Sequence, residues 1–285
     1  MNPFATGVTE ERLGEVRAVL PRGTELLVTT QKGQATEMAH EVAADDTVAY
    51  VFGGDGTFNE VLNGVDARTP VGFIPGGGTS VLPRALGLPR EPIAAARRVA
   101  SGSEHRIGLG RVNGHRFGFG AGIGLDAEVV RAVDALGRQP DGRRPGDLAF
   151  GWAAARTLAR HSFRLEPALE VREHGRAAFA LVSNCAAYSY AGRLPIRVSP
   201  QATFEGGIDL VAPRRLRPYE LPRILSYAFL GGDRGKSRDV LYLHDVDRVE
   251  IVCDRPLPLQ ADGEDLGDVA EAVFEAERDA VTVLV

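Results

Sequence analysis

The sequence YVFGGDGTFNEVLNGV, Tyr50–Val65, carries most of the information about how this chain folds. An apolar strand run enters a glycine-rich turn and continues directly into a helix start. The glycines have no Cβ, so the backbone can approach an anion closely, and the N–H groups of the helix can donate hydrogen bonds to it. This order predicts a phosphate-binding turn with contacts from Gly53, Gly54, Gly56, Thr57, Asn59 and Glu60.

Asp55 is the unusual residue of this turn. A carboxylate repels phosphate unless a divalent cation or a network of donors lies between the two groups. Asp55 therefore indicates Mg²⁺ bound together with a nucleotide. The alternative is a tight strand-to-helix turn in which Asp55 is a helix cap.

The composition is that of a folded protein, and the chain is long enough for two domains. The chain has 285 residues, of which 44% are hydrophobic and 25% charged, and its net charge is −5. This acidic balance argues against a nucleic-acid partner. Since no apolar run approaches about 20 residues and no signal peptide is recognisable, we expect a cytoplasmic protein with local, transient membrane contact. Cys185 and Cys253 have no metal-site spacing and are expected to be buried free thiols.

The pattern along the chain predicts an α/β domain over residues 1–106 and a β-rich domain over 107–285. The last strand is expected to pack back on the first domain. Two glycine-rich turns each follow an apolar strand, which in a parallel sheet places both at the edge where ligands bind. The first domain should contain helices at 10–20, 35–44 and 92–101 and strands at 25–30 and 70–74. The second domain should contain helices at 127–136, 146–159 and 221–230 and a loop at 140–145.

The Asp55 turn resembles the GGDGT nucleotide-binding motif of diacylglycerol kinases, sphingosine kinases and bacterial lipid kinases, which belong with the NAD kinase superfamily. The NEVLNG extension favours the diacylglycerol kinase catalytic family. IPGGGTSVLPRALGLP, Ile74–Pro89, resembles the second loop of that family, but Gly78 stands where the family has threonine and Ser80 where it has asparagine. The resemblance implies an open, mostly parallel NAD kinase-like sheet followed by a β-sandwich.

MNPFATG at the start resembles a turn that follows the first strand of this family, so the first strand of the sheet is expected to be missing. The resemblance to the diacylglycerol kinase catalytic family implies ATP and Mg²⁺ as cofactors. It adds Asn2, Thr30, Gly77, Gly78 and Thr79 to the nucleotide contacts.

LPLQADGEDLG, Leu257–Gly267, resembles the DGE motif of the family, in which Asp262 would be the general base and Glu264 its acidic companion. The chemistry suits an aspartate. Phosphoryl transfer passes through a loose transition state, so the protein positions the hydroxyl and offers an ionised proton acceptor. The alternative is that Asp262 and Gly263 form an ordinary β-turn.

Two further segments concern metals. GIGLDAEVV, Gly122–Val130, resembles a family segment that would place Asp126 in the water and metal network near the catalytic cleft, which makes Asp126 a metal candidate besides Asp55. The alternative for Asp126 is a helix N-cap. In Thr203–Ile208, Gly206 stands where the family has a metal-binding aspartate. We therefore expect no structural Mg²⁺ at that turn.

The resulting expectation is an ATP-dependent lipid kinase that converts diacylglycerol to phosphatidate. A nucleotide-binding regulator without activity and a kinase for NAD or another polar alcohol remain alternatives, whereas an oxidoreductase is disfavoured because no GxGxxG lies in a βαβ context. Arg156, Arg160 and His161 could lie on a membrane face beside an apolar groove, or their helix could pack in the ordinary way. A homodimer is left open.

Overall fold

The computed structural model describes residues 1–44, 47–137, 147–230 and 239–285, and these form two compact units. The first unit comprises Met1–Leu109 and Arg278–Val285. The second comprises, among the described residues, 110–137 and 147–277. The loop predicted at 140–145 lies outside the described residues.

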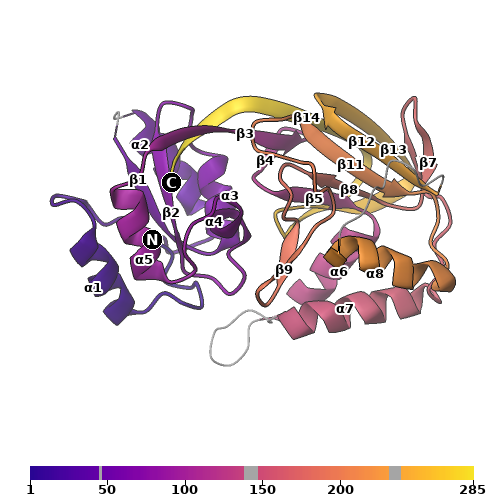
Figure 1. The fold of residues 1–285 in the computed structure, drawn as a ribbon, viewed down its shortest axis with the longest axis horizontal. Helices are drawn as coiled ribbons and strands as arrows, with labels where there is room; N and C mark the ends of the chain where they lie inside the picture. The colour runs from indigo at the N-terminus through magenta and orange to yellow at the C-terminus, as the bar shows by residue number, and fades with distance from the viewer. Residues whose placement is uncertain (45–46, 138–146, 231–238) are drawn as a thin grey trace. The chain divides into compact units, whose positions relative to one another are not determined.

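The first unit is an α/β layer built on parallel strands (Figure 1). β1 (Ala49–Gly53) pairs in parallel with β2 (Pro70–Pro75), and β2 pairs in parallel with the end of β14 (Glu264–Leu284). Both short strands are nearly continuous apolar runs, as expected of strands covered on both faces. The helices of this unit are α1 (Glu10–Val19), α2 (Gln34–Ala44), α3 (Asp55–Leu62), α4 (Val81–Ala85) and α5 (Pro92–Ala100).

The strand predicted at 25–30 is not formed, and its neighbours explain why. The Met1 amino group donates to the Leu27 carbonyl at 2.7 Å, and Thr29 N–H donates to the Met1 carbonyl at 3.0 Å. On the other side, Asn2 N–H donates to the Phe52 carbonyl of β1 at 3.1 Å. Residues 1–2 thus lie between the segment 25–30 and β1, where the expected first strand of the sheet would lie. Two residues are too few to form a ladder of strand hydrogen bonds with that segment.

The second unit is β-rich, as predicted. Its main strands run antiparallel in the order β14, β13 (Arg248–Ala261), β5 (Gly120–Ile123), β8 (Ala180–Ser183), β11 (Ile208–Pro213) and β12 (Val240–Val246). The described part of this unit also has three helices, of which the first two pack against each other (Figure 1). They are α6 (Leu125–Asp134), α7 (Asp147–Arg160) and α8 (Leu221–Leu230), with a 3₁₀ turn η1 (Pro218–Glu220). The other strands of this unit are β4 (His115–Phe117), β6 (Leu169–Val171), β7 (Gly175–Ala177), β9 (Ser189–Ala191) and β10 (Leu194–Ile196). Strand β3 (Glu104–Val112) begins in the first unit and ends in the second.

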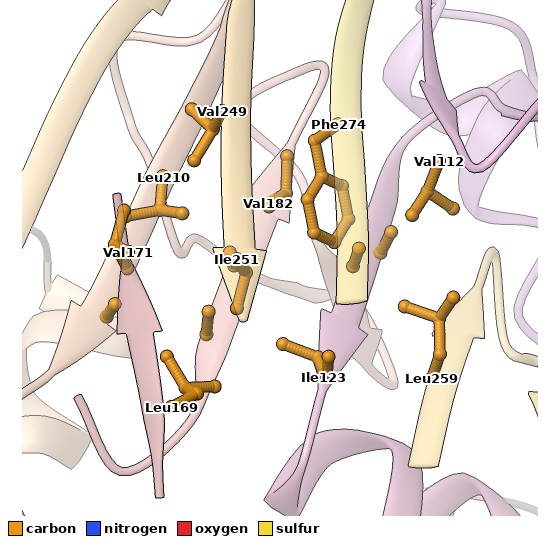
Figure 2. Close-up of a cluster of buried hydrophobic side chains, with 14 of the residues drawn as sticks. Val112, Ile123, Leu169, Val171, Val182, Leu210, Val249, Ile251, Leu259 and Phe274 are labelled. Atoms are coloured by element: carbon orange, nitrogen blue, oxygen red, sulfur yellow. The ribbon is translucent and has the colours of Figure 1, made fainter. Parts of the chain in front are cut away.

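The core of the second unit is formed by alternate residues of these strands. Figure 2 shows the side chains of Ile123, Val182, Leu210 and Ile251 with the ring of Phe274. Because successive side chains of a strand point to opposite faces, the other set of residues is left on the outer face of the sheet. That outer face carries the polar groups described below.

The two cysteines are free and buried, which confirms the prediction for them. Burial raises the pKa of the Cys185 thiol to about 12, so the thiol is neutral and unreactive near pH 7. Among the residues that the structure describes, no helix combines the length and the apolar character needed to cross a membrane.

Close packing at Gly110 gives a stability test for the second unit. A Cβ at Gly110 would lie 2.0 Å from Cζ of the buried Phe117 ring, so Gly110→Ala should lower the free energy of unfolding by about 1–3 kcal/mol. Gly151→Ala is the control, since nothing lies near its Cβ position in α7, and it should raise the free energy of unfolding by roughly 0.5–1 kcal/mol. Urea denaturation measures both, and equal effects would contradict the packing argument.

Candidate functional site

Two glycine-rich loops pack against each other at the carboxyl ends of β1 and β2. Gly76 N–H donates to the Gly53 carbonyl at 2.6 Å. A Cβ on Gly77 would lie 2.9 Å from the Cα of Gly54, so the two backbones meet where side chains cannot fit. The sequence predicted this meeting at the edge of a parallel sheet, and the structure brings the loops together there.

Asp55 connects the two loops. Its Oδ1 accepts hydrogen bonds from the N–H groups of Val81 at 2.7 Å and Leu82 at 3.4 Å, at the start of α4. Ser80, the N-cap residue of α4, has φ 50° and makes no capping bond with its own side chain. Asp55 therefore begins α3 and caps a different helix, which neither sequence interpretation foresaw.

The described residues contain no group of three or more histidine, cysteine, aspartate or glutamate side chains that could hold a metal ion. Hard divalent cations need several oxygen ligands. The side chains present therefore do not form a Mg²⁺ cage by themselves. The metal-binding roles of Asp55 and Asp126 stay predictions.

The other predicted nucleotide contacts divide into two groups. Asn2 lies at the loops, because its Nδ2 donates to the Oγ1 of Thr57 at 2.8 Å. Glu60 instead accepts from the N–H of Ala35 at 3.2 Å near the start of α2, where Thr30 also donates to Gln34. Asn59 is buried in α3, Gly78 is exposed at the tip of the second loop, and Thr79 beside it is partly buried.

The cap made by Asp55 can be tested by substitution. Asp55→Ala removes the acceptor for α4 and should lower the free energy of unfolding by about 1–2 kcal/mol. Asp55→Asn retains an oxygen acceptor and should lose less. Thermal denaturation measures both variants. If Asn and Ala cost the same, the carboxylate oxygen is not the group that holds α4.

In the second unit, Asp262 and Gly263 form the two-residue turn between β13 and β14. Their φ angles are 50° and 79°, as a type I′ hairpin turn requires. The β-turn interpretation of this motif is therefore correct. The side chain of Asp262 is 4% exposed and accepts backbone hydrogen bonds, so the turn also fixes the direction of a carboxylate.

The Asp262 carboxylate is bound by three backbone N–H groups. Gly118 donates to Oδ2 at 2.6 Å, while Phe119 and Gly120 donate to Oδ1 at 3.0 and 3.1 Å. Backbone donors of this kind stabilise the ionised carboxylate and fix its orientation. Glu264 opens β14 opposite Ala261, and its role as the companion acid stays a prediction.

Asp126 lies in the first turn of α6, whose N-cap is Gly124, so the N-cap interpretation of Asp126 is wrong. Its Oδ2 accepts from the hydroxyl of Tyr188 at 2.7 Å and from Nε2 of Gln260 at 2.6 Å. Burial raises the pKa of the Asp126 carboxyl, and these two hydrogen bonds act against that rise. Burial also raises the pKa of Tyr188 well above its ordinary value, so its hydroxyl stays protonated.

The turn at Thr203–Ile208 is closed by a carboxylate from another strand. Asp245 in β12 accepts from the N–H of Gly207 at 2.6 Å, and a Cβ on Gly206 would lie 3.3 Å from the same Oδ1 atom. Sequence reasoning missed Asp245, which is distant along the chain. The expected absence of a structural metal at this turn stays a prediction.

Sequence reasoning also missed Tyr188 and Gln260. A signal existed for Gln260, since it is a polar residue in the otherwise apolar run Leu257–Ala261. Tyr188 offered none. Its contacts are made with residues 62 and 72 positions away in sequence.

Comparison with known proteins identifies the family of this chain. The model for a diacylglycerol kinase catalytic domain matches residues 1–112, and a model described as the YegS C-terminal NAD kinase beta sandwich-like domain matches residues 120–285. The chain belongs to the diacylglycerol kinase-like lipid kinase family. This confirms the resemblance and the NAD kinase-like fold class predicted from the sequence.

Individual members of this lipid kinase family match in part. A diacylglycerol kinase of Bacillus subtilis (strain 168) is 44% identical over 110 residues, covering 37% of this chain and 36% of that relative. A diacylglycerol kinase of Staphylococcus saprophyticus is 35% identical over 98 residues, covering 33% of this chain and 32% of the relative. The chain thus spans about a third of the length of these curated relatives.

A crystal structure of a diacylglycerol kinase from Bacillus anthracis str. Sterne shares the fold along almost the whole chain. It superposes with a TM-score of 0.72 at 20% identity, covering 99% of this chain and 94% of that one. Because the two sequences are only 20% identical, the superposition shows a shared fold and nothing further.

Proposed function

We propose that this protein is an ATP-dependent lipid kinase that phosphorylates a lipid hydroxyl, with diacylglycerol as the first substrate to test. Family membership supports the reaction class. The observation that carries the proposal is the pair of apposed glycine-rich loops joined by Asp55 in the first unit. Exposed backbone beside a helix start is an arrangement that binds phosphate groups.

The proposed reaction forms a bond between the lipid hydroxyl oxygen and the γ-phosphorus of ATP and breaks the bond to ADP. The hydroxyl proton passes to the carboxylate of Asp262. In a loose transition state the proton leaves late, so an oriented, ionised acceptor is sufficient and strong basicity is not required. The three N–H groups on Asp262 provide this orientation.

The described side chains do not supply a cage for Mg²⁺. The proposal therefore has the cation arrive with the phosphates of ATP, as is usual for this ion. The bound Mg²⁺ would screen the negative charge of the phosphates. The protein residues named here act by binding the nucleotide and by accepting the proton.

The proposed lipid acceptor places the protein at a membrane surface, and α7 offers a supporting feature. Trp152 is 66% exposed, and the guanidinium of Arg156 lies 5.6 Å from its ring centroid. Arg160 is also exposed, whereas His161 is partly buried and pairs with Glu128 at 2.8 Å. Exposed tryptophan with arginines suits a membrane interface.

The direct test is phosphorylation by purified protein. Radiolabelled ATP is supplied with mixed micelles that contain diacylglycerol, ceramide or sphingosine, and in a separate reaction with NAD. Labelled phosphatidate is the expected product. Labelled NADP, or nucleotide binding without any transfer, would contradict the proposal and support one of the alternatives named above.

Asp262→Asn should reduce turnover to less than about a tenth of the wild-type value, because the amide cannot accept the proton. The amide would also set an N–H donor against a backbone donor, so some stability should be lost. Asp209→Asn is the matched control, since Asp209 is another buried carboxylate that accepts a backbone N–H. Activity per folded molecule should fall in the first variant and persist in the second.

Gly77→Ala should weaken nucleotide binding about tenfold or more, because its Cβ would force the two loops apart. Gly14→Ala in α1 is the control, since nothing lies within 4 Å of its Cβ position and the residue is outside both loops. Equilibrium dialysis with radiolabelled ATP measures both. Equal affinity in the two variants would place the nucleotide elsewhere.

A further inference from the structure

Alternating glycines on β5 make room for two side chains on the outer face of the sheet. A Cβ on Gly120 would lie 2.6 Å from Cε2 of Tyr188, so the Tyr188 ring lies directly on the strand backbone. A Cβ on Gly122 would lie 2.3 Å from Oδ2 of Asp126. Larger residues at either position would displace these side chains. Gly120 and Gly122 therefore leave the space in which Tyr188 and Asp126 come into contact over β5.

Gln260 completes this group from the neighbouring strand β13. Its Nε2 donates to Oδ2 of Asp126 at 2.6 Å and to the hydroxyl oxygen of Tyr188 at 2.9 Å. Its Oε1 accepts from the N–H of Gly263 at 2.9 Å. The side chain is 3% exposed, so both ends of its amide are engaged in a buried environment. The orientation of the amide follows from these partners, because the acceptor end faces an N–H.

Through Gly263, this group reaches the turn that carries Asp262. The turn is held on one side by Gln260 and on the other by Gly120, whose carbonyl accepts from the N–H of Asp262 and whose N–H donates to Oδ1 of Asp262. The Tyr188 ring lies against Gly120, whose N–H donates to Oδ1 of Asp262. Tyr188 and Gln260 therefore contact both elements that fix the direction of the Asp262 carboxylate.

We propose that Tyr188 and Gln260 are positioning residues for Asp262, held in place by Asp126. The proposal rests on the proposed function in that Asp262 is taken as the proton acceptor. Tyr188 and Gln260 do not accept the proton themselves. They hold the Asp262–Gly263 turn against the N–H groups of Gly118–Gly120, so that the carboxylate keeps one direction.

The hydroxyl of Tyr188 is the most selective point at which to test this arrangement. Tyr188→Phe keeps the ring over Gly120 and removes the hydroxyl that donates to Asp126 or to the Ala121 carbonyl. Gln260→Met keeps approximate size and removes both ends of the amide. The matched control is Tyr242→Phe, which removes a hydroxyl bonded at 3.1 Å to the carboxylate of Asp209 in the same unit.

Steady-state kinetics with ATP and diacylglycerol is the first measurement. Tyr188→Phe and Gln260→Met should each lower kcat about 10- to 100-fold, the effect of misplacing a reacting group, with KM for ATP changed less than about twofold. Because both act through the same turn, the double variant should lose less than the product of the single effects. Tyr242→Phe should keep the wild-type kcat, even if its melting temperature falls as much as that of Tyr188→Phe.

Amide hydrogen exchange is the second measurement, and it does not depend on activity. The amides of Gly263 and Gly118–Gly120 should exchange at least about tenfold faster in Gln260→Met than in wild type, since their partners are loosened. Tyr242→Phe should leave these amides unchanged.

The outcomes separate the two proposals. If wild type transfers phosphate to lipid but the Tyr188 and Gln260 variants keep kcat, or lose no more than Tyr242→Phe, the positioning role is overturned. Unchanged exchange in Gln260→Met also overturns it. If wild type phosphorylates no lipid while exchange accelerates as expected, the proposed function fails and the hold on the Asp262 turn stands.

Discussion

A carboxylate bound by backbone N–H groups organises each of the two units. In the first unit Asp55 binds the start of α4, and in the second Asp262 binds the segment Gly118–Gly120. Such bonds require one piece of backbone to approach another at close range. Glycines allow that approach around Asp55, where a Cβ on Gly77 would lie 2.9 Å from the Cα of Gly54, so their positions constrain this site.

The backbone hydrogen bonds explain why the motifs around Asp55 and Asp262 can be interpreted both as structural turns or caps and as chemical sites. Asp55 was interpreted either as a metal ligand or as a helix cap, and the structure shows a cap of α4, a helix that it does not begin. Asp262 was interpreted either as a base or as a turn residue, and it is in the turn. In both cases the backbone bonds hold a carboxylate in a fixed direction. That property is useful to a phosphoryl-transfer enzyme, which works mainly by positioning.

The outer face of the second unit has a polar character that differs from its core. Leu210 and Val182 lie in the apolar core, whereas Asp209 and Gln260 lie among polar partners. Alternation along the strands separates the two sets. A buried carboxylate on this face is stable because several donors surround it, as tyrosine, histidine and a backbone N–H do around Asp209.

The sequence by itself determined the class of fold and the places of the main motifs. Its alternation of helical and apolar segments gave β1, β2 and the helices α1, α2 and α5 nearly at their observed bounds, because these patterns are local. Helix α8 matched its expected bounds, and α6 began two residues before its predicted start. The strand expected at 25–30 failed because a strand needs a partner, which a local pattern does not supply.

The tertiary structure alone decided which groups surround the predicted residues. Asp126 bonds to Gln260 across 134 positions, and Gly118 bonds to Asp262 across 144. Asp245 reaches Gly207 across 38 positions. Such contacts depend on strand order and register, and a shift of one residue would turn each side chain to the other face. The motifs therefore indicated the chemistry, whereas the orientation of its groups came from the fold.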